Sequence, residues 1–198
     1  MARMAARNPK SNARDMIISM AVILIPVLLL VYFFSAPGDA DKPGAGEASA
    51  ARVNIGQTLE VARAESTFPL LLPEGLGDDW TPMRVGWAQD GENWITGEPA
   101  DGDSWQVGYL GPDQIYYGVQ QRGGSGAAFI TATTREGSAV GGDVELAGHT
   151  WTRYESKDGR TRSLVSKEEG SVAIVSADTD FVSLEAFAAL LVEAAPLG

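Results

Sequence analysis

The stretch that decides the fold is SWQVGYLGPDQIYYGVQQ, residues Ser104 to Gln121. Two runs rich in β-branched and aromatic residues flank Gly-Pro-Asp, a turn signal. A connection this short can only join antiparallel neighbours, so the stretch predicts a β-hairpin. In the first run Trp105, Val107 and Tyr109 alternate with polar or small residues, which predicts burial of one face.

The same pattern of short apolar runs and turns continues toward the C-terminus. Asp-Gly-Arg and Glu-Glu-Gly mark two further hairpins. Besides the two runs above, we predict strands over residues 80–87, 127–134, 149–156, 161–167 and 171–177. The chain then predicts a helix over residues 183–195, with Ser183 as its N-cap and Leu184, Phe187, Ala188 and Leu191 on one stripe. The expected fold is α+β, an antiparallel sheet of about six or seven strands with the C-terminal helix packed on it.

Two segments precede the sheet. Asn54 and Gln57 have the spacing of a capping box and predict a short helix over residues 56–66. FPLLLPEGLGDDW, residues 68–80, contains two prolines and two glycines and predicts an extended, turning segment held by its apolar side chains.

The N-terminal part has a different composition. Residues 16–34 include no charged side chain, and as a helix they would be about 28 Å long, close to the hydrocarbon thickness of a bilayer. A secretory signal has a shorter apolar region and a nearby small-residue cleavage site, so we expect a retained anchor. Basic residues before the run place the N-terminus in the cytoplasm. We therefore expect a cytoplasmic tail (1–15), a transmembrane helix (16–35) in the plasma membrane, a flexible linker (36–52) and an extracytoplasmic domain (53–198).

Charge narrows the classes of partner. The first 35 residues have a net charge of +3, whereas the rest of the chain has −14. An acidic domain lacks the clustered cations that phosphate contacts need, so no nucleic-acid partner is expected. The chain has no cysteine, which excludes disulfides and thiolate catalysis.

Motifs for catalysis, metals and cofactors are weak. His149 is the single histidine and has no nucleophile elbow beside it, so an ordinary half-exposed position is the preferred interpretation. The carboxylate pairs Asp101/Asp103 and Asp178/Asp180 do not continue into a calcium loop and are typical of turns. The glycine-rich residues 122–128 lack the lysine of a phosphate loop. We therefore assign no catalytic residue, metal ligand or cofactor.

Aromatic side chains are the remaining candidates for binding. Most of those between Trp80 and Tyr154 are expected to fill the core of the sheet. The binding residues that we single out are Trp94, Trp87 and Tyr116, with Trp94 the most exposed because it lies in the polar stretch DGENWITGE.

Several ordered segments carry a family resemblance, namely the basic head and apolar run, FPLLLPEGLGDDW, VGYLGPDQIYYGVQQ, WTRYES and SLEAFAALL. In these the chain resembles an actinobacterial family of single-pass membrane proteins with an uncharacterised extracytoplasmic domain (domain of unknown function 4245). The resemblance implies an envelope protein and supplies no catalytic residues. We expect a non-enzymatic module that binds an envelope protein, peptide or glycan. The alternatives are a hydrolase or transferase acting on envelope material, and a structural subunit of a membrane complex.

Overall fold

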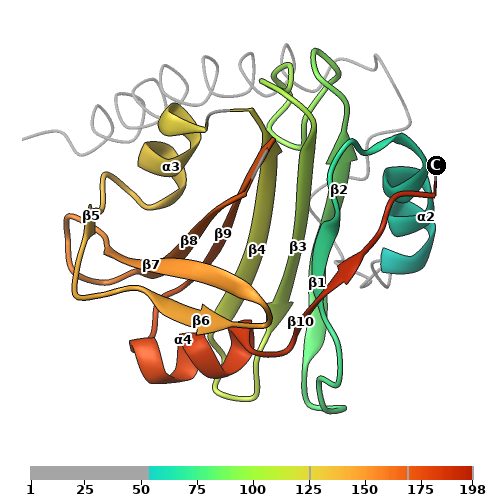
Figure 1. Ribbon diagram of the computed structural model, residues 1–198. Helices are drawn as coiled ribbons and strands as arrows, with labels where there is room; N and C mark the ends of the chain where they lie inside the picture. Colours follow the sequence, from blue (N-terminus) through green and yellow to red (C-terminus); the bar gives the residue numbers. More distant parts are fainter. Residues whose placement is uncertain (1–53, 125, 169, 198) are drawn as a thin grey trace, which may run out of the picture. The chain divides into compact units, whose positions relative to one another are not determined.

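The computed structural model describes residues 54–197 except Ser125 and Glu169 (Figure 1). The predicted cytoplasmic tail, transmembrane helix and linker therefore lie outside the described residues. Within the described residues, no helix has both the length and the apolar character needed to cross a membrane.

The centre of the fold is a large antiparallel sheet. Its strands run in the order β2-β3-β4-β9-β8-β7-β5, and β6 pairs with β7 beside this path. The predicted hairpin is confirmed as β3 and β4, with Gly108 opposite Gly118. The strands are β2 (Thr81–Ala88), β3 (Ser104–Leu110), β4 (Tyr116–Gly123), β5 (Ser138–Ala139), β6 (Val144–Leu146), β7 (His149–Glu155), β8 (Arg162–Glu168) and β9 (Ser171–Ala177).

A two-stranded ribbon lies apart from this sheet and is made of β1 (Leu70–Pro73) and β10 (Leu191–Ala194). The extended segment expected over residues 68–80 is thus confirmed at β1. Side chains of the main sheet hold the ribbon: the Gln121 amide oxygen accepts from the Leu71 backbone N–H at 2.6 Å, and the Trp105 indole donates to the Leu71 carbonyl at 2.9 Å. The two sheets are therefore joined by satisfied buried polar groups.

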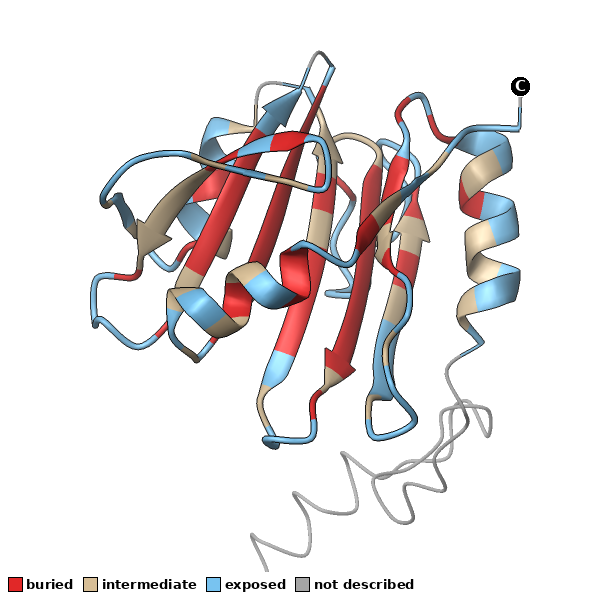
Figure 2. Ribbon diagram, turned by 60° about the horizontal axis from the view of Figure 1, so that its bottom comes forward, coloured by how far each residue is buried: buried red, intermediate tan, exposed pale blue. Residues whose placement is uncertain are grey.

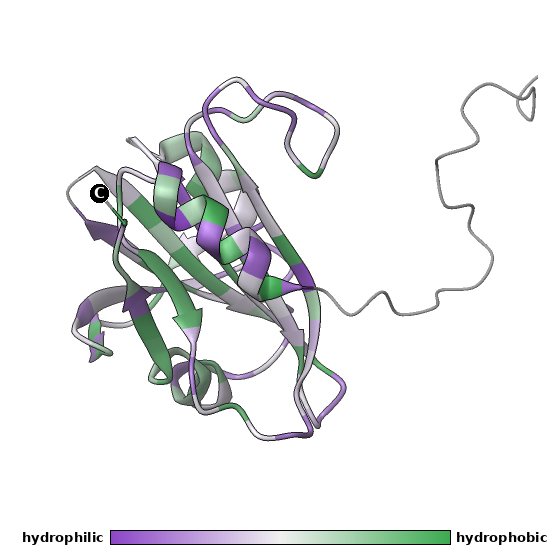
Figure 3. Ribbon diagram, turned by 90° about the vertical axis from the view of Figure 1, so that its right-hand side faces the viewer, coloured by the Kyte–Doolittle hydropathy of each residue, from purple (hydrophilic) through white to green (hydrophobic). Residues whose placement is uncertain are grey.

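Three helices complete the described fold: α2 (Ile55–Glu65), α3 (Ala127–Thr133) and α4 (Phe181–Ala188). The cap predicted for α2 is confirmed, because the Asn54 side chain accepts from the Gln57 N–H at 3.2 Å. α2 contacts β2, and Figure 3 shows hydrophobic and hydrophilic residues mixed along its visible side. Its inner face contributes Ala62, Ile55 and Leu59 to the core.

The two faces of the main sheet bear different helices. Leu184 and Phe187 of α4 pack in the larger core, with Val175 of β9 and Val107 of β3. Phe129 and Ile130 of α3 pack against Val165, Val172 and Ile174 in a smaller cluster. Because Ile174 and Val175 are neighbours on one strand, their side chains lie on opposite faces, and so do the two helices. Figure 2 shows that buried residues follow the central strands and the inner side of α4.

Burial on both faces corrects the prediction for residues 104–110. Gln106, expected on an open face, is only 5% exposed. Its face is covered by Tyr116 and by the connection between β2 and β3, which the alternation of residues could not reveal.

The strand predicted over residues 127–134 is wrong, because this segment forms α3. Gly126 before it has a φ of 62°, in the left-handed region that favours glycine, and turns the chain. The backbone hydrogen bonds stay within the segment: the Ile130 N–H donates to the Gly126 carbonyl at 2.7 Å and the Thr134 N–H to the Ile130 carbonyl at 2.9 Å. The Thr134 hydroxyl donates to the Ile130 carbonyl at 2.7 Å, so its polar group is satisfied within the helix.

The terminal helix predicted over residues 183–195 is confirmed only in its first part. Asp180, not Ser183, is the N-cap, since the Asp180 carboxylate accepts from the Ser183 N–H at 2.8 Å. The helix ends at Ala188, and the chain continues as β10 because β1 provides a partner for its backbone. The α+β class, the large antiparallel sheet and the packed C-terminal helix are thus confirmed. The number of strands was underestimated, since the described residues form ten.

Candidate functional site

The face of the main sheet that carries α3 is hollowed by a groove of about 1090 Å³. We refer to this hollow as the groove. α3 forms one wall, the connection between β2 and β3 (residues 89–103) forms the other, and the strands between them form the floor. Its lining includes the side chains of Arg84, Trp94, Gln106, Tyr116, Gln120 and Arg122.

Paired glycines in the floor leave room for an aromatic ring. Gly108 and Gly118 lie opposite each other in β3 and β4, and the ring of Tyr116 lies across both. A Cβ atom at Gly108 would overlap the Tyr116 hydroxyl, and one at Gly118 would lie 3.1 Å from the ring. Tyr116 is 39% exposed, so the outer face of its ring is open to the groove.

A third glycine, Gly86, lets the β2–β3 connection pack closely on β2. At Gly86 a Cβ atom would lie 2.9 Å from the Ile95 side chain and 3.5 Å from the Trp94 ring. The connection is itself ordered: the Trp94 N–H donates to the Glu98 carbonyl at 2.8 Å, and the Gly102 N–H donates to the Asp90 carboxylate at 2.8 Å. Trp94 is therefore held at the groove by backbone hydrogen bonds of its own loop.

Amide and charged side chains line the groove together with the aromatic ones. The Gln106 amide donates to the Tyr116 hydroxyl at 3.4 Å, and Gln120, opposite Gln106 on β4, also lines the groove. On the α3 side, Arg135 forms an ion pair of 3.5 Å with Asp178. The groove thus combines two aromatic faces with donors and acceptors of hydrogen bonds.

Of the three binding residues predicted from sequence, the structure brings Trp94 and Tyr116 together at the groove and separates Trp87 from them. The Trp87 ring contacts Phe68 edge-on with centroids 6.4 Å apart. Its indole N–H donates to the Glu65 carboxylate at 2.7 Å, so it belongs to the contact with α2. Alternation along β2 explains this placement, because Trp87 and Gly86 are neighbours and their side-chain positions lie on opposite faces.

The remaining aromatic residues are largely core, as expected. Trp105 and Trp151 are fully buried. Trp80, Tyr117 and Phe187 form one aromatic cluster, with the Trp80 and Phe187 rings stacked at 5.3 Å. Burial raises the pKa of the Tyr117 hydroxyl, and its hydrogen bond to Asp113 raises it further. These residues stabilise the domain and do not reach the groove.

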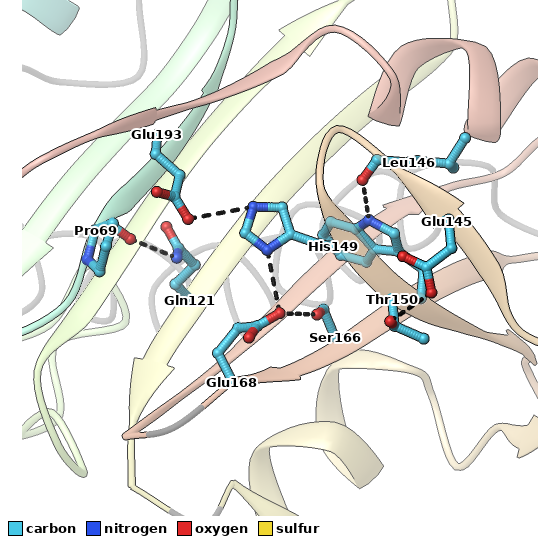
Figure 4. A network of polar contacts seen from close by, with 10 residues as sticks. Pro69, Gln121, Glu145, Leu146, His149, Thr150, Ser166, Glu168 and Glu193 are labelled. Atoms are coloured by element: carbon cyan, nitrogen blue, oxygen red, sulfur yellow. Dashed lines mark hydrogen bonds and ion pairs between the residues drawn. The ribbon is translucent and has the colours of Figure 1, made fainter.

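His149 corrects the expectation of a half-exposed residue, since it is only 8% exposed. Figure 4 shows its ring between two carboxylates: Nδ1 lies 3.1 Å from Glu168 Oε1, and Nε2 lies 3.4 Å from Glu193 Oε1. The contact with His149, followed by one from Ser166, lowers the pKa of Glu168. Because Glu193 belongs to β10 and Glu168 to β8, this triad fastens the ribbon to the main sheet.

The His149 triad is remote from the groove. Glu168 shares the parity of the core residue Leu164 along β8, so the triad lies on the α4 face of the sheet. The histidine therefore does not act on anything held in the groove.

The carboxylates of the two sequence pairs have structural contacts. Asp103 accepts from the Asp90 N–H at 3.2 Å, and Asp178 accepts from the Thr161 hydroxyl at 2.5 Å. Asp180 caps α4, and its hydrogen bonds to Ser183 lower its pKa. The described residues contain no cluster of three or more potential metal ligands among His, Cys, Asp and Glu.

Arg122 and the three strand glycines that shape the groove were not singled out in the sequence analysis. Glycine inside a strand is a known sign of close approach by a ligand or another chain, and Gly86, Gly108 and Gly118 all lie inside predicted strands. That signal would have indicated which face of the sheet is hollow. No comparable signal distinguishes Arg122 from the other cations.

Comparison with known proteins gives one match. No curated protein and no solved structure matches the chain. The family model described as "Protein of unknown function (DUF4245)" matches residues 9–191, which is most of the chain. The chain therefore belongs to the DUF4245 family of proteins of unknown function.

Proposed function

We propose that this domain is a non-enzymatic binding module that holds an oligosaccharide in the groove. The observation that supports this function best is the exposed Tyr116 ring lying across Gly108 and Gly118, in a groove that Trp94 also lines. An aromatic face held in place at low cost in side-chain entropy is a platform for a flat, partly apolar ring.

The chemistry of the lining favours a saccharide. One face of a sugar ring presents C–H groups, which suit an aromatic platform, and its edge presents hydroxyl groups that both donate and accept. The half-buried Gln120 has an amide that also donates and accepts, which matches such hydroxyl groups, while the buried Gln106 amide holds the Tyr116 hydroxyl.

A peptide is a poorer match for this groove. Extended peptides commonly add to a free sheet edge through backbone hydrogen bonds. The central floor strands β3, β4 and β9 each already pair on both sides, so they offer a bound chain no backbone edge; the edge strand among those lining the groove is β2, at its margin. Recognition on this floor must come from side chains.

The proposed function includes a location for the domain outside the plasma membrane. The uncharged run over residues 16–35 and the basic residues before it support a single-pass plasma-membrane anchor with the N-terminus in the cytoplasm. Residues 36–52 would then be a tether, and the domain would meet glycans of the envelope of an actinobacterium. The bilayer itself is the partner of residues 16–35 in this arrangement.

Neither alternative gains an observation in its favour. A hydrolase or transferase would need an acid and a base at the groove, and His149 lies on the other face of the sheet. Of the carboxylates that line the groove, Asp178 is held by Thr161 and Arg135, and Asp101 lies beside Arg122, so these two have structural contacts. A purely structural subunit would not need an open aromatic platform. Binding without turnover is therefore the function that we put to the test.

One neutral and one acidic tetrasaccharide with the same backbone serve as probes. The neutral one is chitotetraose, and the acidic one is a peptide-free tetrasaccharide of alternating N-acetylglucosamine and N-acetylmuramic acid. Calorimetry with the full-length chain in detergent should detect binding of at least one of them. Trp94→Ala and Tyr116→Ala should each weaken it about tenfold, the upper range for an aromatic contact. Val182→Ala, which truncates an exposed side chain on α4, is the control and should bind normally. Absence of binding by both probes, or normal binding by both aromatic variants, would refute the function.

A further inference from the structure

Arg122 occupies a distinctive position in the groove. It lies on β4 opposite Ser104 of β3, between the two walls. Its guanidinium stacks over the Phe129 ring of α3 at 4.7 Å. Its stem passes the β2–β3 connection, where a Cβ atom at Gly102 would lie 3.7 Å from Arg122 Cγ. The guanidinium is thereby fixed in direction before any ligand arrives.

The polar contacts of Arg122 are incomplete. Its buried Nε has no hydrogen-bond partner in the part of the chain that the structure describes. Its Nη1 lies 3.9 Å from Asp101 Oδ2, and the Asp101 side chain is 91% exposed, whereas that of Arg122 is 20% exposed. An ion pair of this length with an exposed partner contributes little. A buried donor without an acceptor lowers stability, so this arrangement does not optimise the fold.

The guanidinium is suited to an anion. Its planar set of donors matches the two oxygens of a carboxylate, and stacking on an aromatic ring preserves that plane. We propose that Arg122 is the anion subsite of the groove and binds an acidic substituent of the saccharide. This inference rests on the proposed function, since it names the class of oligosaccharide that the groove selects.

The charge around the groove agrees with this selection. Three of the nine Lys and Arg side chains in the described residues line it, against three of the 21 Asp and Glu side chains. Among the described residues Arg84 has no ion pair, and Arg135 is paired with Asp178. The groove is thus locally balanced on an otherwise acidic domain, so an acidic saccharide is not repelled there.

The two tetrasaccharides test the subsite directly, because they share a backbone and differ in the lactyl carboxylates. The full-length chain should bind the acidic tetrasaccharide about tenfold more tightly than chitotetraose, as expected for one charge-assisted contact. Arg122→Gln should lower the affinity for the acidic tetrasaccharide to that for chitotetraose, and the affinity for chitotetraose should not change. Arg122→Lys should keep part of the preference for the acidic tetrasaccharide. Arg160→Gln, an exposed cation outside the groove, is the matched control and should leave the preference unchanged.

Asp101→Asn gives a second readout that does not depend on the folding of the Arg122 variants. Asp101 places a negative charge near the guanidinium, where the ligand carboxylate would bind, so its neutralisation removes a repulsion and should strengthen binding of the acidic probe while leaving chitotetraose unaffected. Equal binding of both probes by the unmodified chain would overturn the subsite and leave the proposed function standing. Failure of both probes to bind would overturn the two together.

Discussion

Gly108→Ala is the substitution that tests the construction of the groove most directly. The new Cβ would overlap the Tyr116 hydroxyl, which is the far end of a partly exposed side chain. The ring can therefore swing toward solvent, and the β3–β4 backbone need not move. The change removes the aromatic platform without deleting an aromatic residue.

Two opposing effects set the expected stability. Alanine inside a strand gains about 0.5–1 kcal/mol over glycine. Displacing Tyr116 loses its 3.4 Å hydrogen bond with Gln106 and its contact with the floor, together about 1 kcal/mol. The free energy of unfolding should therefore stay within about 0.5 kcal/mol of the unmodified chain. In a Tyr116→Ala background only the gain remains, so Gly108→Ala should there stabilise by about 0.5–1 kcal/mol.

A double-mutant cycle measures the energetic coupling between positions 108 and 116. Urea unfolding of the full-length chain and its three variants should give a coupling of about 1 kcal/mol between positions 108 and 116. Gly142→Ala is the control, because a Cβ there meets nothing within 4 Å. Affinity for the tetrasaccharides should fall about five- to tenfold in Gly108→Ala. Additivity within about 0.3 kcal/mol would refute the reasoning, and a loss above about 2 kcal/mol in the single variant would show that the backbone had moved.

Three further predictions concern the fold. Gly126→Ala should cost at least about 1–2 kcal/mol in urea unfolding, because φ is 62° there and a Cβ atom would lie 2.6 Å from the Val172 side chain, whereas Gly142→Ala should not; an unaffected Gly126 variant would contradict the turn into α3. Leu184→Ala, at a fully buried position, should cost about 2–5 kcal/mol in the same assay, against less than about 0.5 kcal/mol for Val182→Ala; equal effects would contradict the packing of α4. The neighbouring histidine lowers the pKa of Glu168, so the folded state binds fewer protons there than the unfolded state, and stability should decrease as the pH falls through the carboxyl range. Unfolding measured from about pH 7 to 3 should show a shallower acid limb in Glu168→Gln, and an unchanged limb would exclude this contribution.

Local sequence patterns predicted the parts of the fold that rest on local chemistry. The hairpin over residues 104–121 follows from its turn and its β-rich flanks, and the start of α2 follows from the cap at Asn54. The strand β10 could not be predicted in this way, since LVEA adjoins a helix and becomes a strand only because β1 is available to pair with it. The same holds for α3, whose two adjacent buried residues meet a sheet surface that is distant in the sequence.

In the candidate site, too, the features that depend on tertiary contacts could not be predicted from local sequence. Trp94 was expected to be the most exposed of the three aromatic residues, but it is half-buried against Gly86, and Tyr116 is the exposed one. The choice between Trp87 and Tyr116 depended on which face of the sheet each residue reached. Trp87 lies on the packed face, where α2 and Phe68 cover it. The position of Arg122 between two walls required the tertiary fold, because the stacking ring of Phe129 comes from a segment that the sequence predicted to be a strand.

Alternation along the strands explains how one sheet provides both stability and a binding surface. On β3, Trp105, Val107 and Tyr109 enter the larger core, whereas Gln106 and Gly108 face the groove. The groove face therefore gives up apolar burial, which is the largest favourable term in folding. The core on the other face compensates, because fully buried side chains such as Leu184 and Val175 pack there against α4. Because the two sets of residues share a backbone but not a face, side chains in the groove can change with little effect on the core.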